Sequence, residues 1–486
     1  MSSSEPLSPF LREQFAHALG PKGFLEDPSD IAPWLKDWRG VYEGRASAIL
    51  APANAKEVQA VVRLASEHNI PLVPQGGNTS MVGGATPPLD GGALILSMRR
   101  MNKIRSIESD AGIVIAEAGV ILSNLHDAAS AVGQRFPLTL GAKGSATIGG
   151  LVSTNAGGTQ VLRFGTMRKL VLGVEAVLPD GALFNGLTVL KKDNRGYDLS
   201  QLLIGAEGTI GIVTAASLRL FPAAHDRAVG WMGVETPQMA LSLLRAMEAQ
   251  SGDAIESFEI IPDASLSLVL QHIPNTRAPL SGRHPWHVLV EYAVTKESGK
   301  TAQSLLTDLI AGQIDANCVR DAVVALNEAQ ALAFWHLRDS ISEAERASGP
   351  AMQHDISVPI SAMPDFMISA AAQVEARFPG VTASAFGHLG DGNVHFHVRA
   401  PQGGEGEEWR KTVGYAASQF VYDLVSAAGG SLSAEHGIGQ MKLAELVRQS
   451  DSTRLNALRA IKNAFDPKGI MNPGKLVPLA SARAAP

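Results

Sequence analysis

The sequence predicts an α+β protein with at least two domains, and three observations support this prediction. The chain has 486 residues, more than one hydrophobic core normally organises. Apolar residues with helical spacing alternate with short apolar runs typical of strands. The pattern changes after Phe221 and Pro222, so we expect a second domain to begin near Ala223.

The first domain is expected to alternate helices and strands. Val58, Val61, Val62 and Leu64 form an apolar stripe that predicts a helix over residues 56–68. Short apolar runs predict strands, the first of them closed by Pro74. The further expected elements are strands at 70–73, 93–96, 113–116 and 209–219, a strand-like stretch at 170–183 with a turn at 179–181, and a helix at 122–132.

The later part of the chain is also mixed. We expect a helix at 238–249, a strand at 286–292 and a helix at 444–465. The expected domains are residues 1–222, residues 223–430 and a C-terminal segment at 431–486. This mixture of elements is the basis of the α+β prediction.

The composition describes a soluble globular protein. The net charge is −6, and this mild acidity argues weakly against nucleic acid as a partner. Cys318 is the only cysteine, so an internal disulfide and a thiolate zinc site are both excluded. The first residues lack the order of a secretory signal, and no apolar stretch is long enough to span a bilayer. We therefore expect a cytoplasmic protein without a transmembrane segment.

Two glycine-rich segments, at 74–84 and 141–158, are candidates for phosphate binding. Glycine lets backbone N–H groups approach an anion without a Cβ in the way. Neither segment has the G-x-G-x-x-G or the Walker spacing, so a nucleotide would bind in another fold. The alternative is that both segments are ordinary glycine-rich turns.

These two segments resemble the flavin loops of the FAD-binding family that includes vanillyl-alcohol oxidase and p-cresol methylhydroxylase. Further matches follow in order, at 163–165, 192–199, 204–214 and 472–475. The resemblance implies a two-subdomain FAD-binding domain of the p-cresol methylhydroxylase type, a second α+β substrate (cap) domain, and a C-terminal segment that returns to the FAD domain.

The resemblance also implies which residues bind the cofactor. Covalent members carry a His in the first loop, where this chain has Asn78, so we expect non-covalent FAD. The implied FAD-binding residues are Pro74, Gln75, Gly76, Gly77, Asn78, Thr79, Met81, Gly141, Ser145, Thr147, Gly149, Gly150, Thr154, Asn155, Gly157, Glu207, Gly208, Gly211, Ile212 and Asn472.

Histidines cluster at 387–397, and a second motif lies at 433–439. On a strand, His395 and His397 would share one face, opposite Val394 and Phe396, and His388 could reach that face from a loop. Imidazole with a carboxylate suits a borderline divalent metal. Spacing alone leaves a structural or solvated cluster as the alternative.

The two motifs together resemble the D-2-hydroxyglutarate and D-lactate dehydrogenase-like branch of the family, in which G-H-x-G-D-G-N-x-H and E-H-G occur together. The resemblance implies that His388, His395 and Glu435 hold a divalent metal, which we expect to be zinc. It also implies that His436 is the general base.

Four further residues are expected to bind substrate. On one helix, Arg338 and Ser342 would lie on the same face, or else be simply exposed. In the family an Arg there binds a carboxylate, which suits its bidentate geometry. Gln353 stands where 2-hydroxyglutarate-specific members have Lys, and His397 where they have Asn. These departures leave the identity of the acid open.

The function implied is metal-assisted, FAD-dependent oxidation of a D-2-hydroxy acid to a 2-oxo acid. The stretch at 191–198 favours D-2-hydroxyglutarate or a similar diacid over glycolate and D-lactate, which share the same motifs. Outside this class of enzyme, the sequence leaves open a non-catalytic flavin-binding protein and a metal-only hydrolase. No NAD site is found, so we expect electron-transfer flavoprotein or a quinone as the acceptor. A homodimer is a further expectation.

Overall fold

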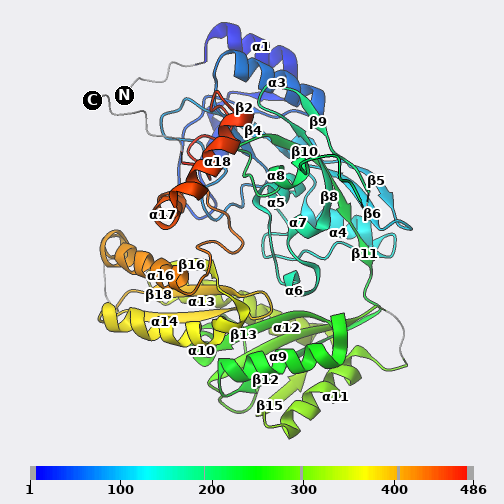
Figure 1. Ribbon diagram of the computed structural model, residues 1–486, viewed down its shortest axis with the longest axis vertical. Coiled ribbons are helices and arrows are strands. Elements are labelled where there is room, and N and C mark those ends of the chain that lie inside the picture. Colours follow the sequence, from blue (N-terminus) through cyan, green and yellow to red (C-terminus); the bar gives the residue numbers. More distant parts are fainter. Residues whose placement is uncertain (1–6, 191, 296–298, 402–405, 479–486) are drawn as a thin grey trace. The chain divides into compact units, whose positions relative to one another are not determined.

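The computed structural model describes residues 7–190, 192–295, 299–401 and 406–478, and the chain divides into two compact units (Figure 1). Unit 1 comprises Met1–Gly157, Thr166–Pro222 and Glu435–Pro486. Unit 2 comprises Gly158–Gly165 and Ala223–Ala434. Each unit contains its own sheets and apolar core.

The first sheet of unit 1 has four strands in the order β1 (Phe24–Leu25), β2 (Ile49–Leu50), β4 (Leu94–Ser97) and β3 (Leu72–Gln75). Strands β2, β4 and β3 are parallel, and the helix α3 (Ala55–Glu67) connects β2 to β3. Its valines are fully buried, and α1 (Pro9–Leu19) joins the same core. The helix predicted at 56–68 and the strand predicted at 93–96 are confirmed to within one residue at each end. The strand predicted at 70–73 instead runs from Leu72 to Gln75. Pro74 lies within it and does not end it, which is possible because β3 is the last strand of its sheet.

The second sheet of unit 1 is antiparallel, and short helices lie in the connections between its strands. Its order is β5 (Ile104–Glu108), β6 (Ile113–Glu117), β10 (Ile212–Arg219), β8 (Val171–Val177) and β9 (Leu183–Asn185). The helices are α4 (Leu122–Ser130), α5 (Ile148–Thr154), α7 (Met167–Leu170) and α8 (Leu199–Leu203), and a short pair joins β7 (Gln134–Arg135) to β11 (Phe221–Pro222).

The C-terminal segment belongs to unit 1. The single helix expected at 444–465 is instead two helices, α17 (Leu443–Gln449) and α18 (Ser452–Phe465). The helix breaks because the Asp451 side chain accepts the backbone N–H of Arg454 and caps α18. Beyond α18, Met471 lies parallel to Leu72 of β3. The expected return of the C-terminus to this domain is therefore confirmed.

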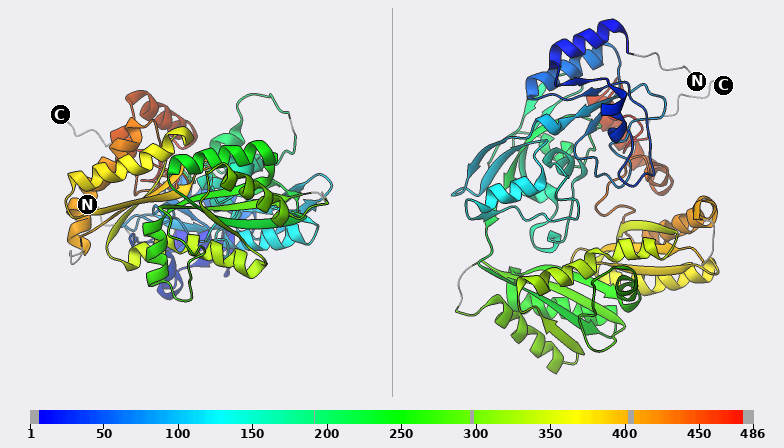
Figure 2. Two further views of the ribbon diagram at one scale, coloured as in Figure 1. Left: turned by 90° about the horizontal axis from the view of Figure 1, so that it is seen from below. Right: turned by 180° about the vertical axis from the view of Figure 1, so that it is seen from behind.

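Unit 2 is built on a seven-stranded antiparallel sheet. The order is β15 (Asp321–Val324), β12 (Asp226–Val234), β14 (Trp286–Val294), β13 (Ile255–Pro262), β17 (Thr382–His388), β18 (Asn393–Arg399) and β16 (Ala351–Ser357). Helices cover both faces of this sheet (Figures 1 and 2). One layer contains α9 (Pro237–Ser251), α11 (Ala302–Asp315), α14 (Met363–Arg377) and α16 (Tyr415–Ala427).

The other face of this sheet packs against α10 (Asp263–His272), α12 (Glu328–Asp339) and α13 (Ile341–Ala347). Strand alternation divides the core between the two layers, so Met232 lies in the first and its neighbour Trp231 in the second. The short helix α6 (Val161–Phe164) joins unit 2 because Arg163 forms a 2.6 Å ion pair with the buried Glu256 on β13. The α+β class is confirmed.

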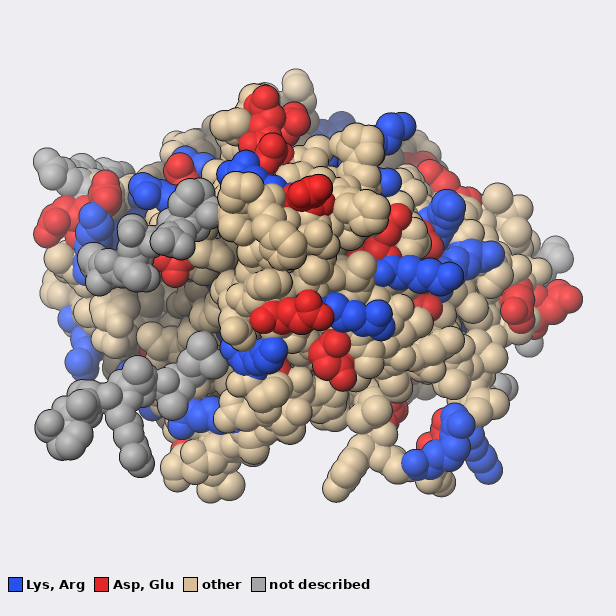
Figure 3. All heavy atoms as spheres, turned by 90° about the horizontal axis from the view of Figure 1, so that it is seen from above, with Lys and Arg blue, Asp and Glu red and all other residues tan. Residues whose placement is uncertain are grey.

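The surface carries charges of both signs. On the face drawn in Figure 3, Lys and Arg side chains alternate with Asp and Glu. Across the described ranges, no helix has both the length and the apolar character needed to cross a bilayer.

Candidate functional site

The two glycine-rich segments of unit 1 meet backbone to backbone. A Cβ built on Gly77 would lie 1.8 Å from the carbonyl oxygen of Ser145, and one on Gly76 would lie 2.2 Å from the hydroxyl of Thr147. Residues about 70 positions apart in the chain therefore pack so closely that only glycine fits. The two candidate phosphate-binding segments therefore lie against each other and form one cradle.

Two further segments join this cradle. A Cβ on Gly208 would meet the Pro74 ring at 2.4 Å. The amide of Asn472 donates to the backbone oxygens of Gly84 and Glu207, at 3.0 and 2.8 Å. The loop after β3, the stretch before β10 and the C-terminal segment are thus held together beside the second loop.

The side chain of Glu207 is occupied within unit 1. Its two carboxylate oxygens accept the backbone N–H groups of Ile438 and Gly439, at 2.7 and 2.8 Å. Burial raises the pKa of this carboxyl, against the lowering effect of those hydrogen bonds and of Lys475. Burial likewise lowers the pKa of Lys475 to about 8. Glu207 therefore anchors the loop that follows the E-H-G motif.

Other residues predicted to bind the cofactor form hydrogen bonds or close contacts with neighbouring residues of unit 1. The Thr154 hydroxyl donates to the Gly150 carbonyl inside α5, and Asn155 ends that helix in the left-handed region with its side chain accepting from Arg168. A Cβ on Gly141 would meet nothing within 4 Å, so a close approach does not explain that glycine. Gly149 packs against Ala118, because a Cβ built on Gly149 would lie 2.6 Å from the Cβ of Ala118.

The remaining predicted flavin residues take their places in the same segments. Asn78 has a left-handed φ of 54° and donates its amide to the Lys36 carbonyl at 2.8 Å. Thr79 and Met81 follow it in the first loop, Gly157 follows α5, Gly211 precedes β10, and Ile212 is the first residue of β10.

The cradle offers polar atoms that fit a dinucleotide. Within the described ranges, the buried hydroxyl of Thr147 and the buried amide oxygens of Gln75, Asn78 and Asn472 have no hydrogen-bond partner. Buried polar groups are normally satisfied. A hydroxyl can donate to a phosphate and an amide oxygen can accept a ring N–H, so these residues fit FAD.

In unit 2, the first histidine motif forms a tight hairpin between β17 and β18. His388 is the last residue of β17 and not, as expected, part of a loop. The carboxylate of Asp391 accepts the Asn393 N–H at 2.9 Å. A Cβ on Gly387, whose φ is 159°, would lie 2.2 Å from the Asn393 carbonyl. The hairpin therefore requires this glycine to bring His388 opposite Asn393.

A polar face spans the strands at the β16 edge of this sheet. His395 lies opposite Asp355 on one side and Phe386 on the other. His397 lies opposite Gln353 and Ser384. Residues paired across strands share a face, so both histidines project from one side. Val394 and Phe396 point into the apolar layer behind, which confirms the predicted alternation.

His388 belongs to a buried hydrogen-bonded cluster. Its Nδ1 lies 2.6 Å from Oε1 of Glu259, and the Nε of Arg338 donates to Oε2 of the same carboxylate at 2.9 Å. Burial alone would raise the pKa of Glu259, but Arg338 and His388 hold it below its ordinary value. Arg338, predicted to bind substrate, is thus already positioned by a residue that was not predicted.

The residues proposed as metal ligands converge. The His388 and His395 rings are T-shaped, with centroids 5.4 Å apart. Glu435 is bonded directly to Ala434, the last residue of unit 2, whose N–H reaches the Asp355 carbonyl. Ligand atoms of His388, His395 and Glu435 lie within 4.8 Å of one another, and so do those of Asp355, Glu435 and His436.

The four predicted substrate residues lie on four elements, α12, α13, β16 and β18. Arg338 and Ser342 were expected on one helix, but α12 ends at Asp339 and α13 begins at Ile341. The prediction of a continuous helix is wrong because the chain bends at Ser340, which caps both helices. Gln353 on β16 donates to the Ser342 carbonyl at 3.4 Å, which links two of the predicted residues.

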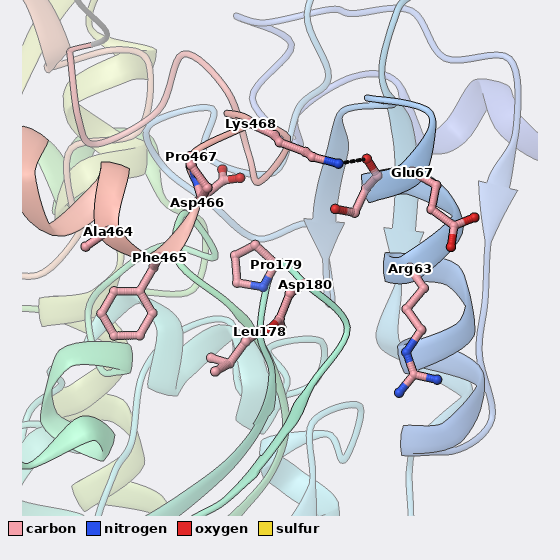
Figure 4. A pocket seen from close by; sticks show the side chains of 11 residues that line it. Arg63, Glu67, Leu178, Pro179, Asp180, Ala464, Phe465, Asp466, Pro467 and Lys468 are labelled. Atoms are coloured by element: carbon pink, nitrogen blue, oxygen red, sulfur yellow. Dashed lines mark hydrogen bonds between the residues drawn. The ribbon is translucent and has the colours of Figure 1, made fainter.

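A surface cavity of unit 1 contains none of the predicted residues. It has a volume of about 600 Å³ and is lined by α3, the β8–β9 turn and the end of α18. Figure 4 shows charged side chains of both signs around it, with Lys468 bonded to the backbone beside Glu67. It has no feature that points to a ligand.

Two family models match the chain. An FAD-binding domain matches residues 46–186, and the C-terminal domain of FAD-linked oxidases matches residues 224–476. The chain belongs to the FAD-linked oxidase family. It is therefore an FAD-dependent oxidoreductase.

Curated relatives of this oxidase match along most of the chain. Identity is 34% to a mitochondrial D-2-hydroxyglutarate dehydrogenase of Arabidopsis thaliana, covering 96% of this chain and 81% of the relative. It is 36% to the corresponding Bos taurus protein, covering 94% and 82%. It is 32% to a putative mitochondrial D-lactate dehydrogenase of Schizosaccharomyces pombe, covering 93% and 85%.

The fold of the oxidase also matches a solved structure. A structure of p-cresol methylhydroxylase with bound substrate has a TM-score of 0.74 at 17% identity, covering 96% of each chain. The predicted fold of the p-cresol methylhydroxylase type is confirmed.

The expected cytoplasmic location is wrong, because the relatives from A. thaliana, B. taurus and S. pombe are named as mitochondrial proteins. The expectation rested on one cysteine and on missing signals. Neither distinguishes the cytoplasm from other compartments.

Sequence reasoning missed two acidic residues of the site. Glu259 and Asp355 are both buried, and each lies in a strand next to a predicted histidine. For Glu259 the available signal was a carboxylate between Phe258 and Ile260, since such a charge is rarely buried without a partner.

Proposed function

We propose that this FAD-linked oxidase is a metal-assisted dehydrogenase that converts a D-2-hydroxy acid, best D-2-hydroxyglutarate or a similar diacid, to the 2-oxo acid. The observation that carries the proposal is the match, at 34% and 36% identity along almost the whole chain, to relatives named for that activity. The polar face of unit 2, together with Glu435 and His436 that follow its last residue in the chain, offers the residue types that the reaction needs.

Each polar residue has a proposed role. Arg338 and Ser342 bind the carboxylate next to the reacting carbon, since a guanidinium pairs well with a carboxylate. His436 takes the hydroxyl proton at a ring nitrogen, a role in which enzymes use imidazole more often than any other side chain. Gln353 and His397 contact the far end of the acid. When bound, FAD accepts the hydride and a divalent cation polarises the hydroxyl.

The proposed metal ligands are His388, His395 and Glu435, which fit zinc by type and number. Two imidazoles and one carboxylate leave a coordination position open for substrate. Their convergence within 4.8 Å supports the proposal, although the same donors would accept other divalent cations.

FAD is proposed to bind without a covalent bond, in the cradle of unit 1. Asn78 stands where covalent relatives carry histidine, and its amide is bonded to the chain. Denaturation should release all yellow colour into the supernatant. Colour that stays with the precipitated protein would contradict this proposal.

The identity of the acid is the finer question. Gln353 and His397 both offer hydrogen bonds, and a relative named as a putative D-lactate dehydrogenase matches at 32% identity, which keeps D-lactate and glycolate as the second candidates. Lys191, part of the stretch that favours the diacid, lies outside the described residues.

Steady-state kinetics with an artificial dye as electron acceptor test the proposal. Values of kcat/KM should be highest for D-2-hydroxyglutarate, lower for D-malate, D-lactate and glycolate, and negligible for L-2-hydroxyglutarate. A higher kcat/KM for D-lactate or glycolate would show that the proposed diacid is wrong and that the preferred acid is the substrate. No turnover with any acid, despite bound FAD, would favour a non-catalytic flavoprotein.

The proposed physiological acceptor is electron-transfer flavoprotein or a quinone, and a homodimer is the proposed assembly. Flavin reoxidation by purified acceptors and light scattering of the purified protein test these two statements.

A further inference from the structure

A carboxylate that no motif revealed lies at the centre of the polar site. Glu259 is on β13, directly opposite His388 on β17 in the antiparallel register. Its exposed fraction is 1%. Burying an unpaired carboxylate is strongly unfavourable, so the structure around Glu259 must satisfy both of its oxygens.

Each oxygen of Glu259 holds a different proposed site residue. Oε1 lies 2.6 Å from Nδ1 of His388, and Oε2 accepts from Nε of Arg338 at 2.9 Å. Because both oxygens are used, one side chain fixes the position of a proposed metal ligand and of a proposed substrate-binding arginine. Hydrogen bonds between charged groups are also the stronger ones.

The hydrogen bond from His388 selects its tautomer. A carboxylate only accepts, so Nδ1 carries the proton and Nε2 keeps its lone pair. A terminal nitrogen of Arg338 lies 3.2 Å from Nε2 and 3.4 Å from Nδ1. Arg338 therefore contacts the His388 ring as well as Glu259. With its proton on Nδ1, the ring would bind a metal ion through Nε2, the arrangement in which outer carboxylates tune ligand histidines.

We propose that Glu259 is a positioning residue that orients His388 toward the divalent metal and aligns Arg338 with the substrate carboxylate. This inference rests on the proposed function. It assigns to one buried side chain a link between metal binding and substrate binding, which are otherwise provided by residues on different elements.

The substitution Glu259→Gln tests the proposal with little change in shape. An amide has one oxygen and one NH₂ group, so it offers an acceptor at only one of the two positions that the Glu259 oxygens occupy. We expect the affinity for Zn²⁺ and Co²⁺ to fall about 10- to 100-fold and the KM for the acid to rise. FAD content should be unchanged, since FAD is proposed to bind in unit 1.

Glu256→Gln is the matched control. Glu256 lies on the same strand, is fully buried, and forms an ion pair with Arg163 at 2.6 Å. Its carboxylate pairs with Arg163 and accepts from Gln160, so its loss should lower stability without lowering metal affinity. Glu259→Asp keeps the charge but shortens the side chain, and it provides a second variant if the amide form does not fold.

The readout is metal affinity, measured by competition with a chromophoric chelator after metal removal, together with the Co²⁺ absorption spectrum. Equal metal affinity in wild type, Glu259→Gln and Glu259→Asp would overturn the proposal, as would an equal loss in Glu256→Gln. A wild type that binds no divalent cation would also overturn it. A wild type that binds metal but oxidises no D-acid would refute the proposed function alone.

Discussion

The close packing of the two glycine-rich loops makes Gly77→Ala a decisive substitution. The added Cβ would lie 1.8 Å from the Ser145 carbonyl oxygen and 2.7 Å from its carbon. These atoms belong to the backbone, so no side-chain rotation relieves the overlap. The two loops must separate, and the proposed phosphate-binding N–H groups move with them.

The expected cost follows from overpacking. Inserting a methyl group into a packed region costs about 1–3 kcal/mol, and a backbone clash places Gly77→Ala at the upper end. If the whole cost appears in FAD binding, about 3 kcal/mol corresponds to a loss of roughly 100-fold in affinity. Fluorescence titration of the apoprotein with FAD measures this loss, and circular dichroism checks folding.

Gly144→Ala is the control, because a Cβ at Gly144 would meet nothing within 4 Å. It should bind FAD as wild type does. The reasoning fails if Gly77→Ala binds FAD with unchanged affinity and unfolds at an unchanged temperature, since the loops would then not be in the close contact described.

Three further predictions concern the proposed base, the metal and a buried lysine. His436→Ala should still bind FAD, but the D-acid should reduce this FAD about 10²- to 10⁴-fold more slowly than in wild type. Stopped-flow absorbance measures the rate, and a rate equal to that of wild type would refute the role of His436 as the base. Chelation should abolish reduction by the acid but not by dithionite, and Zn²⁺ should restore it; full activity of the metal-free protein would contradict metal assistance. Lys475 has a folded pKa of about 8, below its ordinary 10.5, so its unfolded form binds the extra proton between those values. Stability of the wild type relative to Lys475→Met should therefore rise from pH 8 to 10.5, by roughly 1.4 kcal/mol per pH unit. Thermal midpoints across that range test this, and parallel curves would refute it.

The fold could be predicted where the local pattern was strong. The valine stripe of α3 and the alternation at His395 and His397 both appear in the structure as expected. The break between α17 and α18 was missed, because the Asp451 cap is one polar residue within an otherwise helical pattern. The bend at Ser340 was missed for a similar reason, since nothing in the local sequence excludes helix there.

Residues of the candidate site could be proposed from the sequence where the motifs are continuous in the chain. His388, His395 and the Glu435–His436 pair were found in this way, and the structure brings their atoms together. Glu259 could not be found, because its role depends on a pairing between β13 and β17 that joins residues 129 positions apart. The use of Glu207 to hold Ile438 and Gly439 is equally non-local.

An anaerobic absorbance spectrum of the purified protein, before and after addition of stoichiometric D-2-hydroxyglutarate, tests the central claim most directly. We predict a flavin band that bleaches on addition of the acid, with one equivalent of 2-oxo acid formed for each flavin reduced. A flavin band that remains unchanged with every D-2-hydroxy acid, in metal-replete protein that dithionite still bleaches, would contradict the account.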